Sequence, residues 1–269
     1  MKIGLAQMNT RDNKEDNIAS ALELIDELAA EGAQLIMLPE YFNFLGPDAH
    51  MPENAEPPDT SGSLAAIHRK ANELKVHIYV GSYLERDGDR VYNTGVVFDR
   101  AGEALAKYRK IHLFDVVIPG GLTYLESEWI TAGDQVVTFD IGDIRFGMST
   151  CYDLRFPELY RRLADQGAQV ILVPAAFTLQ TGRDHWELLL RARAVENLCW
   201  VAAAGQWGPA PPDHTCFGRS MVINPWGIVV AQAPDGVSTV LAEIDRGAIE
   251  KIRTSFPALN HRRKDLFPV

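Results

Sequence analysis

One eight-residue stretch occurs twice in the chain, about half the chain length apart. Residues 32–39 read GAQLIMLP and residues 167–174 read GAQVILVP, in a sequence of 269 residues. In each copy, a glycine that can end a helix precedes a continuous apolar run, which is the pattern of a strand buried on both faces of a parallel sheet. The repeat therefore predicts an α/β fold. Either two related halves pack their sheets together in one sandwich, or two αβ units share the same local pattern by chance.

Strand and helix patterns alternate through the remainder of the chain. Predicted strands cover residues 2–8, 35–38, 76–84, 91–98, 104–106, 141–148, 170–173 and 200–204, followed by a meander over 219–224, 228–232 and 239–244. Predicted helices run from a cap at Asn13 to Gly32 and over residues 64–74, 157–166, 185–198 and 249–256. Turn residues at 87–89 indicate an antiparallel hairpin, so we expect mixed sheets. Loops are expected at 44–62, 119–121 and 205–218, and a single domain is expected over residues 1–269.

The charge and cysteine content exclude several classes of protein. A formal net charge of −10, without a clustered cationic face, argues against a nucleic-acid or anionic-membrane partner. No run of about twenty apolar residues exists, so no membrane-spanning segment is predicted. Three scattered cysteines, at positions 151, 199 and 216, do not form a disulfide framework. A reducing cytoplasm is therefore the expected compartment, and in it a thiol can remain reactive.

Cys151 lies where a buried strand is expected to give way to a helix. The strand pattern ends at Met148, and Pro157 opens the helical pattern. Such a position lies at the carboxyl edge of an α/β sheet, where ligands bind and where a sharp turn exposes the side chain beside main-chain N–H groups. A cysteine that only fills core space is the alternative. The position makes Cys151 a candidate nucleophile.

A cysteine nucleophile needs a base, a group that stabilises an oxyanion, and an acid for the leaving group. Glu40 follows a buried strand, and Lys110 ends the segment AKYRK. A Glu–Lys ion pair in a desolvated pocket can exchange protons with a thiol, while two unrelated surface residues are the alternative. His112 and His185 are the candidate bases of a Cys–His arrangement, although neither ends an apolar strand. No Cys or His pair has the spacing of zinc ligands.

The candidate residues lie in three blocks, LPEYF around Glu40, KYRKIHLFD around Lys110, and STCYDLRFPELYR with Cys151. These blocks resemble the signature blocks of the nitrilase superfamily, the carbon–nitrogen hydrolases with a Glu-Lys-Cys triad. The resemblance continues through TGRDHWELLLRARAVEN and MVINPWG and covers nearly the whole chain in order. LFD, IPG at 118–120, Glu126-Ser127 and HRRKDLF at 261–267 are most similar to the Nit branch, which holds ω-amidases and deaminated glutathione amidases.

This resemblance implies a four-layer α-β-β-α sandwich that dimerises through helices or forms a higher homo-oligomer. It implies hydrolysis of a small amide, of the deaminated glutathione or α-keto-ω-amide type, through a Cys thioester and without metal or organic cofactor. Glu40, Lys110 and Cys151 would be catalytic. Glu126 and the main-chain N–H of Tyr152 would support them, with a surface loop position as the alternative for Glu126. A nitrilase or an N-carbamoyl amidase would use the same triad, and a catalytically idle dimeric scaffold is the alternative of another class.

Further residues are expected to contact the substrate. Arg155 offers a two-pronged cation to a substrate carboxylate, and an ion pair with Glu158 is the alternative. Tyr41, Phe42, Phe177 and Thr181 are expected to line the pocket, with plain core packing as the alternative for the aromatic residues. The segment CFGR at 216–219 departs from relatives that often carry His or Trp-Gly-His there. The added cation Arg219 would change which acid group the pocket prefers.

Overall fold

The computed structural model describes residues 1–117 and 123–267. Its strands are β1 (Lys2–Gln7), β2 (Leu35–Met37), β3 (His77–Asp87), β4 (Arg90–Phe98), β5 (Ala104–Arg109), β6 (Asp115–Val117), β7 (Thr123–Leu125), β8 (Thr138–Ile141), β9 (Ile144–Met148), β10 (Val170–Ala175), β11 (Trp200–Gly205), β12 (Trp207–Ala210), β13 (His214–Phe217), β14 (Met221–Ile223), β15 (Val229–Gln232) and β16 (Ser238–Glu243). The longer helices are α1 (Lys14–Ala30), α2 (Gly62–Leu74), α3 (Pro157–Asp165), α5 (Glu187–Asn197) and α6 (Arg246–Ser255). Short helical segments are η1 (Asp48–His50), η2 (Pro52–Asn54), η3 (Pro58–Thr60), η4 (Glu126–Glu128), η5 (Cys151–Arg155), α4 (Leu179–Thr181), η6 (Gly182–Trp186) and η7 (Ala258–His261). The loop expected at 119–121 and the IPG block at 118–120 lie outside the described residues.

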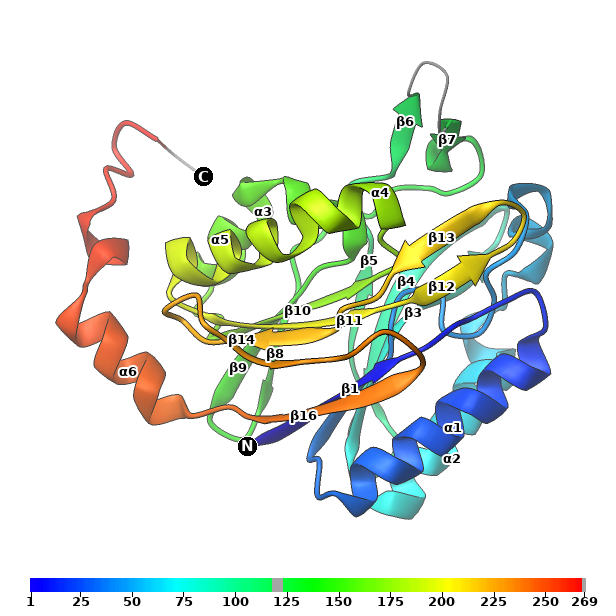
Figure 1. The fold of residues 1–269 in the computed structure, drawn as a ribbon, viewed down its shortest axis with the longest axis horizontal. Coiled ribbons are helices and arrows are strands. Elements are labelled where there is room, and N and C mark those ends of the chain that lie inside the picture. The colour runs from blue at the N-terminus through cyan, green and yellow to red at the C-terminus, as the bar shows by residue number, and fades with distance from the viewer. Residues whose placement is uncertain (118–122, 268–269) are drawn as a thin grey trace.

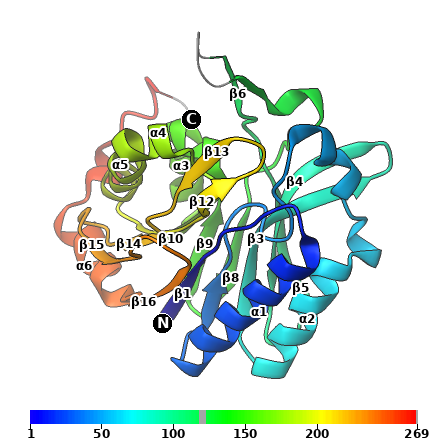
Figure 2. The same ribbon diagram turned by 45° about the vertical axis from the view of Figure 1, so that its right-hand side comes forward.

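Two six-stranded sheets lie face to face at the centre of the fold (Figure 1). The first has the strand order β16-β1-β2-β3-β4-β5, and the second has the order β15-β14-β11-β10-β9-β8. Helices α1 and α2 cover the outer face of the first sheet, and α3 and α5 cover the outer face of the second (Figure 2). Each sheet contains both parallel and antiparallel pairs. The predicted α/β four-layer sandwich with mixed sheets is confirmed.

The two copies of the repeated stretch occupy equivalent places in the two sheets. β2 lies between parallel β1 and β3, and β10 lies between parallel β9 and β11. Gly32 and Gly167 precede these strands with left-handed φ angles of +88° and +90°, which glycine adopts without steric cost. Each glycine ends a helix in the same way and directs the chain into a central strand. The arrangement favours two related halves over chance resemblance.

The buried strands explain the continuous apolar runs in the sequence, because successive side chains enter different layers. Leu35 of β2 and Val170 of β10 lie in the core between the two sheets. Ile36 packs instead between the first sheet and its helices, and Ile171 packs between the second sheet and its helices. Both faces of each central strand are therefore apolar.

The predicted meander is wrong in its last strand. β14 and β15 pair in the second sheet, whereas β16 crosses to the first sheet and pairs antiparallel with β1. The amide of Gln7 on β1 donates to the carbonyls of Pro234 at 2.8 Å and Gly236 at 2.7 Å, which holds the connection against the first sheet. Local alternation identifies β16 as a strand but does not determine which sheet provides its partner.

Two further segments differ from the sequence expectation. The loop expected at 205–218 forms the antiparallel hairpin β12–β13. The helix expected at 185–198 is preceded by α4 and η6, so helical structure begins already at Leu179. Along residues 1–117 and 123–267, no helix has the length and apolar character needed to cross a bilayer.

Candidate active site

Three predicted site residues lie just beyond strand ends and line one pocket. Glu40 lies in the turn after β2, Lys110 directly follows β5, and Cys151 opens η5 after β9. Glu40 and Lys110 are 1% and 2% exposed, whereas Cys151 is partly exposed. The fold thus brings an acid, an ammonium group and a thiol together from distant parts of the sequence.

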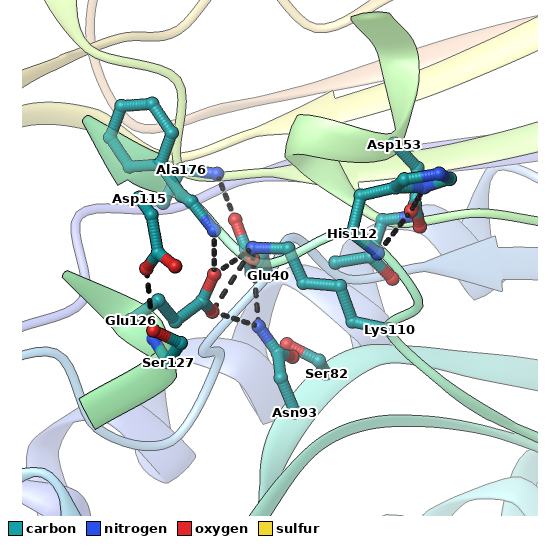
Figure 3. A network of polar contacts seen from close by, with 12 residues as sticks. Glu40, Ser82, Asn93, Lys110, His112, Asp115, Glu126, Ser127, Asp153 and Ala176 are labelled. Carbon is teal, nitrogen blue, oxygen red and sulfur yellow. Dashed lines mark hydrogen bonds and ion pairs between the residues drawn. The ribbon is translucent and has the colours of Figure 1, made fainter. Parts of the chain in front are cut away.

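The ammonium group of Lys110 lies between two glutamate carboxylates (Figure 3). Its Nζ is 3.1 Å from Oε1 of Glu40, and it is 3.0 Å and 2.8 Å from Oε1 and Oε2 of Glu126. Burial alone lowers the pKa of Lys110, but the charges of Glu126 and Glu40 outweigh burial and hold the pKa well above its ordinary value. Lys110 is therefore a permanent cation at the base of the pocket.

The two oxygens of the Glu40 carboxylate have different partners. Oε1 accepts an N–H of Asn93 at 2.8 Å as well as the ammonium group of Lys110. Oε2 accepts the main-chain N–H of Ala176 at 2.8 Å. The same N–H contacts the thiol of Cys151, so Oε2 is the oxygen on the thiol side.

Glu126, predicted to have a supporting role, is fully buried beneath Lys110. Its Oε1 accepts the hydroxyl of Tyr41 at 2.7 Å, and its Oε2 accepts the main-chain N–H of Phe114 at 2.6 Å. Burial, followed by the charge of Glu126, raises the pKa of Tyr41 well above its ordinary value, so the hydroxyl remains a donor. With donors on both oxygens, Glu126 acts as a hydrogen-bond acceptor that fixes the position of Lys110.

The main chain is left-handed next to the acid and at the thiol. Tyr41, which follows Glu40, has φ +57°, and Cys151 has φ +46°. Residues other than glycine rarely adopt this conformation, and such strain gathers at functional sites. At Tyr41 the conformation is held by Ser82, whose Oγ accepts the Tyr41 N–H at 3.0 Å. At Cys151 it forms the sharp turn that the sequence predicted between strand and helix.

The surroundings of Cys151 keep its thiol protonated. Burial raises the pKa of the Cys151 thiol, and the negative charge of Glu40 raises it further. Lys110 and the N–H of Ala176 lower it, but the net pKa lies well above the ordinary value. A neutral thiol therefore lies beside a carboxylate oxygen that can accept its proton and a cation that can stabilise the resulting anion.

Asp153 connects the turn of Cys151 to the segment after Lys110. Its Oδ2 accepts the N–H of Thr150 at 2.8 Å and the hydroxyl of Tyr108 at 2.6 Å, and Oδ1 accepts the N–H of His112 at 3.0 Å. The first hydrogen bond of η5 runs from the Asp153 N–H to the Thr150 carbonyl at 3.0 Å. The main-chain N–H of Tyr152, predicted to bind an oxyanion, belongs to the residue before Asp153 and takes no part in that hydrogen bond.

A small pocket at the thiol opens into a wide groove. The pocket beside Glu40 and Lys110 has a volume of about 50 Å³, and a second recess of about 30 Å³ extends from Cys151 toward Arg155. The groove outside them has a volume of about 900 Å³. Its walls include His214, which also lines the pocket beside Glu40 and Lys110, and Arg155 and Thr181, which also line the recess at Cys151. A small acyl group fits at the thiol, while larger groups must lie in the groove.

The predicted substrate contacts divide into two groups. Arg155 and Thr181 line both the groove and the recess at Cys151, and Phe177 lines that recess beneath the Arg155 guanidinium, 5.2 Å from ring centroid to Cζ. In the described part of the chain, no carboxylate lies within ion-pair distance of Arg155, so the alternative pairing with Glu158 does not form. Tyr41 lines the inner pocket with its hydroxyl on Glu126.

For Phe42 the alternative of core packing holds, and the expectation about Arg219 is wrong. Phe42 lies in the core between the first sheet and its helices, because the left-handed turn at Tyr41 directs it away from the pocket. Arg219 is on the surface, where its guanidinium pairs with Asp235 at 3.0 Å and lies outside the lining of the groove. The cation at position 219 therefore does not alter the charge of the pocket.

The histidines considered as bases have other partners. His112 Nδ1 lies 2.7 Å from Oδ1 of Asp153, and its ring stacks on Phe156 at 3.8 Å between centroids. His185 Nδ1 lies 3.3 Å from Nη1 of Arg155 in the groove wall. Among the residues described, no group of three or more His, Cys, Asp or Glu side chains is placed to hold a metal ion.

The sequence analysis missed several polar residues that organise the site. Asn93 interrupts the apolar strand β4, and Gln206 follows the apolar strand β11 and donates to the main-chain carbonyl of Glu40 at 2.9 Å. His214 lines the mouth of the inner pocket from β13. A buried polar side chain within an apolar strand requires a partner, and that requirement is the signal that could have identified Asn93 and Gln206.

Comparison with known proteins identifies the family. The family model described as carbon–nitrogen hydrolase matches residues 2–254. The chain belongs to the carbon–nitrogen hydrolase family. This hydrolase is 39% identical to the human omega-amidase NIT2 over 270 residues, which is 100% of the chain and 97% of the relative. It is 40% identical to a deaminated glutathione amidase of Synechocystis over 261 residues, 95% of the chain and 96% of the relative.

Solved structures agree with this assignment. The fold of this carbon–nitrogen hydrolase matches Nit3 of Saccharomyces cerevisiae, a member of branch 10 of the nitrilase superfamily, with a TM-score of 0.89 and 32% identity. The match covers 98% of the chain and 96% of Nit3. The sequence resemblance to the nitrilase superfamily and its Nit branch is confirmed. The protein is an amidase, a hydrolase of carbon–nitrogen bonds other than peptide bonds.

Proposed function

We propose that this amidase hydrolyses a small amide whose acid part carries a second, anionic group, of the deaminated glutathione or α-keto-ω-amide type. Glu40, Lys110 and Cys151 form its catalytic triad, supported by Glu126 and by the main-chain N–H of Tyr152. The observation that carries the proposal is the buried Lys110 ammonium, held by two carboxylates beside a protonated thiol. The relatives named as amidases match this chain over nearly their full length, which supports the same reaction class.

The first half-reaction transfers the acyl group to sulfur. Glu40 takes the thiol proton while Sγ of Cys151 attacks the amide carbon, and the carbonyl electron pair moves onto oxygen. Lys110 and the Tyr152 N–H stabilise this oxyanion. When the oxyanion collapses, the carbon–nitrogen bond breaks and protonated Glu40 gives its proton to the departing nitrogen. Ammonia or an amine leaves, and a thioester remains on Cys151.

The second half-reaction releases the acid. Glu40, again ionised, removes a proton from a water molecule as the water oxygen attacks the thioester carbon. The carbon–sulfur bond breaks, and the thiolate of Cys151 recovers a proton from Glu40. Glu126 keeps Lys110 in place through both steps, because its oxygens accept the ammonium group at 3.0 Å and 2.8 Å. The charge at the base of the pocket is therefore the same at the start and at the end.

Arg155 is the proposed contact for the anionic group of the substrate. Its guanidinium lines the recess that extends from Cys151, lies over Phe177, and contacts His185 rather than a carboxylate. A planar guanidinium can bind a carboxylate through two parallel hydrogen bonds. Phe177, Thr181 and Tyr41 complete the wall of the acyl site. The small volume at the thiol favours a short acyl chain between Cys151 and Arg155.

Hydrolysis of a panel of compounds tests this function. Purified protein is assayed against deaminated glutathione, α-ketoglutaramate, an N-carbamoyl compound and a nitrile, with ammonia, amine and carbon dioxide measured as products. We expect release of the acid from the first two compounds only. Cys151→Ala removes the thiol, leaves Lys110 paired with its carboxylates, and is expected to abolish turnover without unfolding the chain. Turnover by that variant would disprove the triad.

We further propose that residues 1–269 act as one hydrolase domain that assembles into a homodimer or larger homo-oligomer. Exposed apolar side chains gather on the outer side of α5, the β14–β15 turn and α6. We call this surface the α5–α6 patch, and it consists of Leu188, Val195, Trp226, Ile228, Val230 and Phe256. The Trp226 and Phe256 rings lie 6.1 Å apart, and Gly227 lies directly against Val195. A second copy would remove this surface from water.

The proposed compartment is a reducing cytoplasm. Cys151, Cys199 and Cys216 are all free thiols in the structure. The proposed reaction needs Cys151 reduced, since an oxidised sulfur cannot attack an amide carbon. A reducing compartment meets that need without a dedicated reductant.

A further inference from the structure

Asn93 contacts both glutamates that hold Lys110 (Figure 3). Its amide nitrogen donates to Oε1 of Glu40 at 2.8 Å and is 3.4 Å from Oε1 of Glu126. Its main-chain carbonyl accepts the N–H of Lys110 at 2.9 Å. The residue is 1% exposed and is absent from the lining of the pocket. Asn93 therefore touches the charged groups of the site but not the space that a substrate can enter.

The oxygen of the Asn93 side-chain amide indicates the role of the residue. Its Oδ1 is buried and has no hydrogen-bond partner among the described residues. Rotating the amide would place this oxygen against two carboxylates and leave the nitrogen without an acceptor, so the observed orientation is the one that electrostatics favours. A buried acceptor without a partner is costly and needs an explanation. The donor end, placed between two glutamates, provides one.

Counting lone pairs on Glu40 shows the consequence. A carboxylate oxygen accepts about two hydrogen bonds. Oε1 already has two donors, Asn93 and Lys110, whereas Oε2 has the N–H of Ala176 and one remaining position on the thiol side. A proton that arrived on Oε1 would have to displace one of two N–H donors. A proton on Oε2 displaces nothing and stays within reach of Cys151.

We propose that Asn93 is a positioning residue, which keeps Oε1 of Glu40 occupied and so reserves Oε2 to take the proton of Cys151 and pass it to the leaving nitrogen. This inference rests on the proposed role of Glu40 as base and acid. The proton moves from Sγ to Oε2 when sulfur attacks, and from Oε2 to nitrogen when the carbon–nitrogen bond breaks. Asn93 itself gains and loses no proton.

Several titratable groups face Glu40 and set the background for any pH measurement. They are Tyr41 on the same turn, Tyr79 of β3, Lys110 after β5, Tyr124 of β7, Glu126 of η4, Cys151 of η5 and Cys216 of β13. Substitution at Asn93 leaves all of them in place. In Asn93→Leu, which adds no charge, a change in the acid limb of the pH profile can therefore be assigned to the lost N–H donor.

Two variants and a pH profile test the proposal. Asn93→Leu removes the donor and the unpartnered oxygen together, and Asn93→Asp replaces the donor with a third carboxylate. For both we expect kcat for amide hydrolysis to fall about tenfold or more with KM nearly unchanged, since one hydrogen bond to a charged group is lost outside the pocket. The acid limb of kcat/KM moves to higher pH, because the Glu40 carboxylate holds its proton more tightly without that donor. The shift is larger for Asn93→Asp, because the third carboxylate also disfavours the ionised form of Glu40.

Asn197 provides a matched control. It is also buried, its Oδ1 also lacks a partner, and its amide nitrogen donates to the Arg193 carbonyl at 2.9 Å and lies 3.4 Å from Oε1 of Glu196. Asn197→Leu and Asn197→Asp are expected to change stability but not kcat or the acid limb. Thermal unfolding establishes which variants are folded, and Asn93→Leu, which adds no charge, is the deciding variant if Asn93→Asp does not fold.

Alkylation of Cys151 by iodoacetamide, measured against pH, separates this inference from the proposed function because it needs no substrate. The acid limb of the alkylation rate should move to higher pH in the Asn93 variants and stay at the wild-type pH in the Asn197 variants. If the wild-type protein hydrolyses no amide but the shift is present, the proposed function fails and the positioning role stands. A folded Asn93→Leu variant with the wild-type kcat and wild-type acid limbs would overturn the inference.

Discussion

Asp153 and His112 are joined twice through one oxygen. The main-chain N–H of His112 donates to Oδ1 of Asp153 at 3.0 Å, and the imidazole Nδ1 lies 2.7 Å from the same atom. The other oxygen of Asp153 accepts the N–H of Thr150 at 2.8 Å. One carboxylate therefore fixes the segment after Lys110 against the turn that carries Cys151. The relative position of the ammonium group and the thiol depends on this connection.

Asp153→Asn is expected to reduce both stability and turnover. The carboxylate is fully buried and only accepts hydrogen bonds, so an amide at this position would direct a donor at one of its present donors. We expect the free energy of unfolding to fall by about 1–3 kcal/mol and amide turnover to fall at least tenfold. Urea denaturation and steady-state kinetics measure the two effects.

Asp140→Asn is the control for that prediction. Asp140 accepts two hydrogen bonds from the guanidinium of Arg145, at 2.8 Å and 2.9 Å, but both of these side chains are about half exposed. Exposed ion pairs contribute little, so neither stability nor turnover should change measurably. Equal losses in the two variants would show that the position of Asp153 in the fold has no special importance.

The fold was predictable where local pattern determines structure. The apolar runs of β2 and β10 indicate strands buried on both faces, and two such strands with flanking helices specify two covered sheets. The partner of β16 was not predictable, because β16 pairs with β1, which lies more than two hundred positions away, as do the Pro234 and Gly236 carbonyls that the Gln7 amide binds. Periodicity reports which face of a strand is buried and not which sheet the strand joins.

The candidate site was predictable in part for a related reason. Glu40 and Cys151 end apolar runs, so a sequence alone marks them as polar groups at a sheet edge. Asn93 lies within β4 and meets Glu40 only through a contact that spans 53 positions. The sequence left Phe42 open between the pocket and the core, because Tyr41 has a left-handed main chain that redirects the residue after it, and no local pattern predicts that turn.

Arg155→Gln is expected to weaken binding of an acidic amide. The guanidinium lines the recess beside Cys151 without a carboxylate partner in the described chain. Loss of hydrogen bonds to a charged group costs about 1.5–3 kcal/mol, so kcat/KM for an amide with a carboxylate should fall about 10- to 100-fold, mainly through KM. For a neutral amide, such as a simple aliphatic amide, the variant and the wild type should differ little.

Arg219→Gln is the matched control, because that arginine pairs with Asp235 on the surface and lies outside the groove. Its kinetics should equal those of the wild type with either substrate. If Arg155→Gln lowered kcat/KM equally for acidic and neutral amides, Arg155 would act on the shape of the site and not on the substrate charge.

Val195→Glu is expected to shift the protein toward the monomer. Val195 is 48% exposed in the α5–α6 patch, next to Gly227. A carboxylate buried at an interface without a partner carries a desolvation cost, so association should weaken by at least tenfold. Light scattering after size-exclusion chromatography gives the molar mass as a function of concentration.

Leu105→Glu serves as the comparison for the interface. Leu105 is 42% exposed on β5 at the edge of the first sheet, away from α5 and α6. We expect the oligomer to survive this change. A wild-type protein that remains monomeric at high concentration would remove the patch from consideration as an interface between copies.

The stability of the protein is expected to fall between pH 9 and pH 11, and Cys199 accounts for part of that loss. Burial raises the pKa of the Cys199 thiol from 9.0 to about 11, although Arg253 opposes the shift. The unfolded chain loses the thiol proton near pH 9 while the folded chain retains it, so the stabilising contribution is complete below pH 9. It is lost as the pH rises toward 11, by about 2–3 kcal/mol for a shift of this size.

Cys199→Ala should therefore become relatively less harmful as the pH rises. The variant leaves a small cavity at every pH, but it lacks the titrating thiol, so its free energy of unfolding should approach that of the wild type from pH 9 to pH 11. Val201→Ala, at a fully buried position on β11, the strand that begins one residue after Cys199, creates a cavity without removing a titrating group. Its difference from the wild type should stay constant with pH. Parallel curves for Cys199→Ala and the wild type would mean that the folded thiol ionises as readily as the unfolded one, and would contradict the prediction.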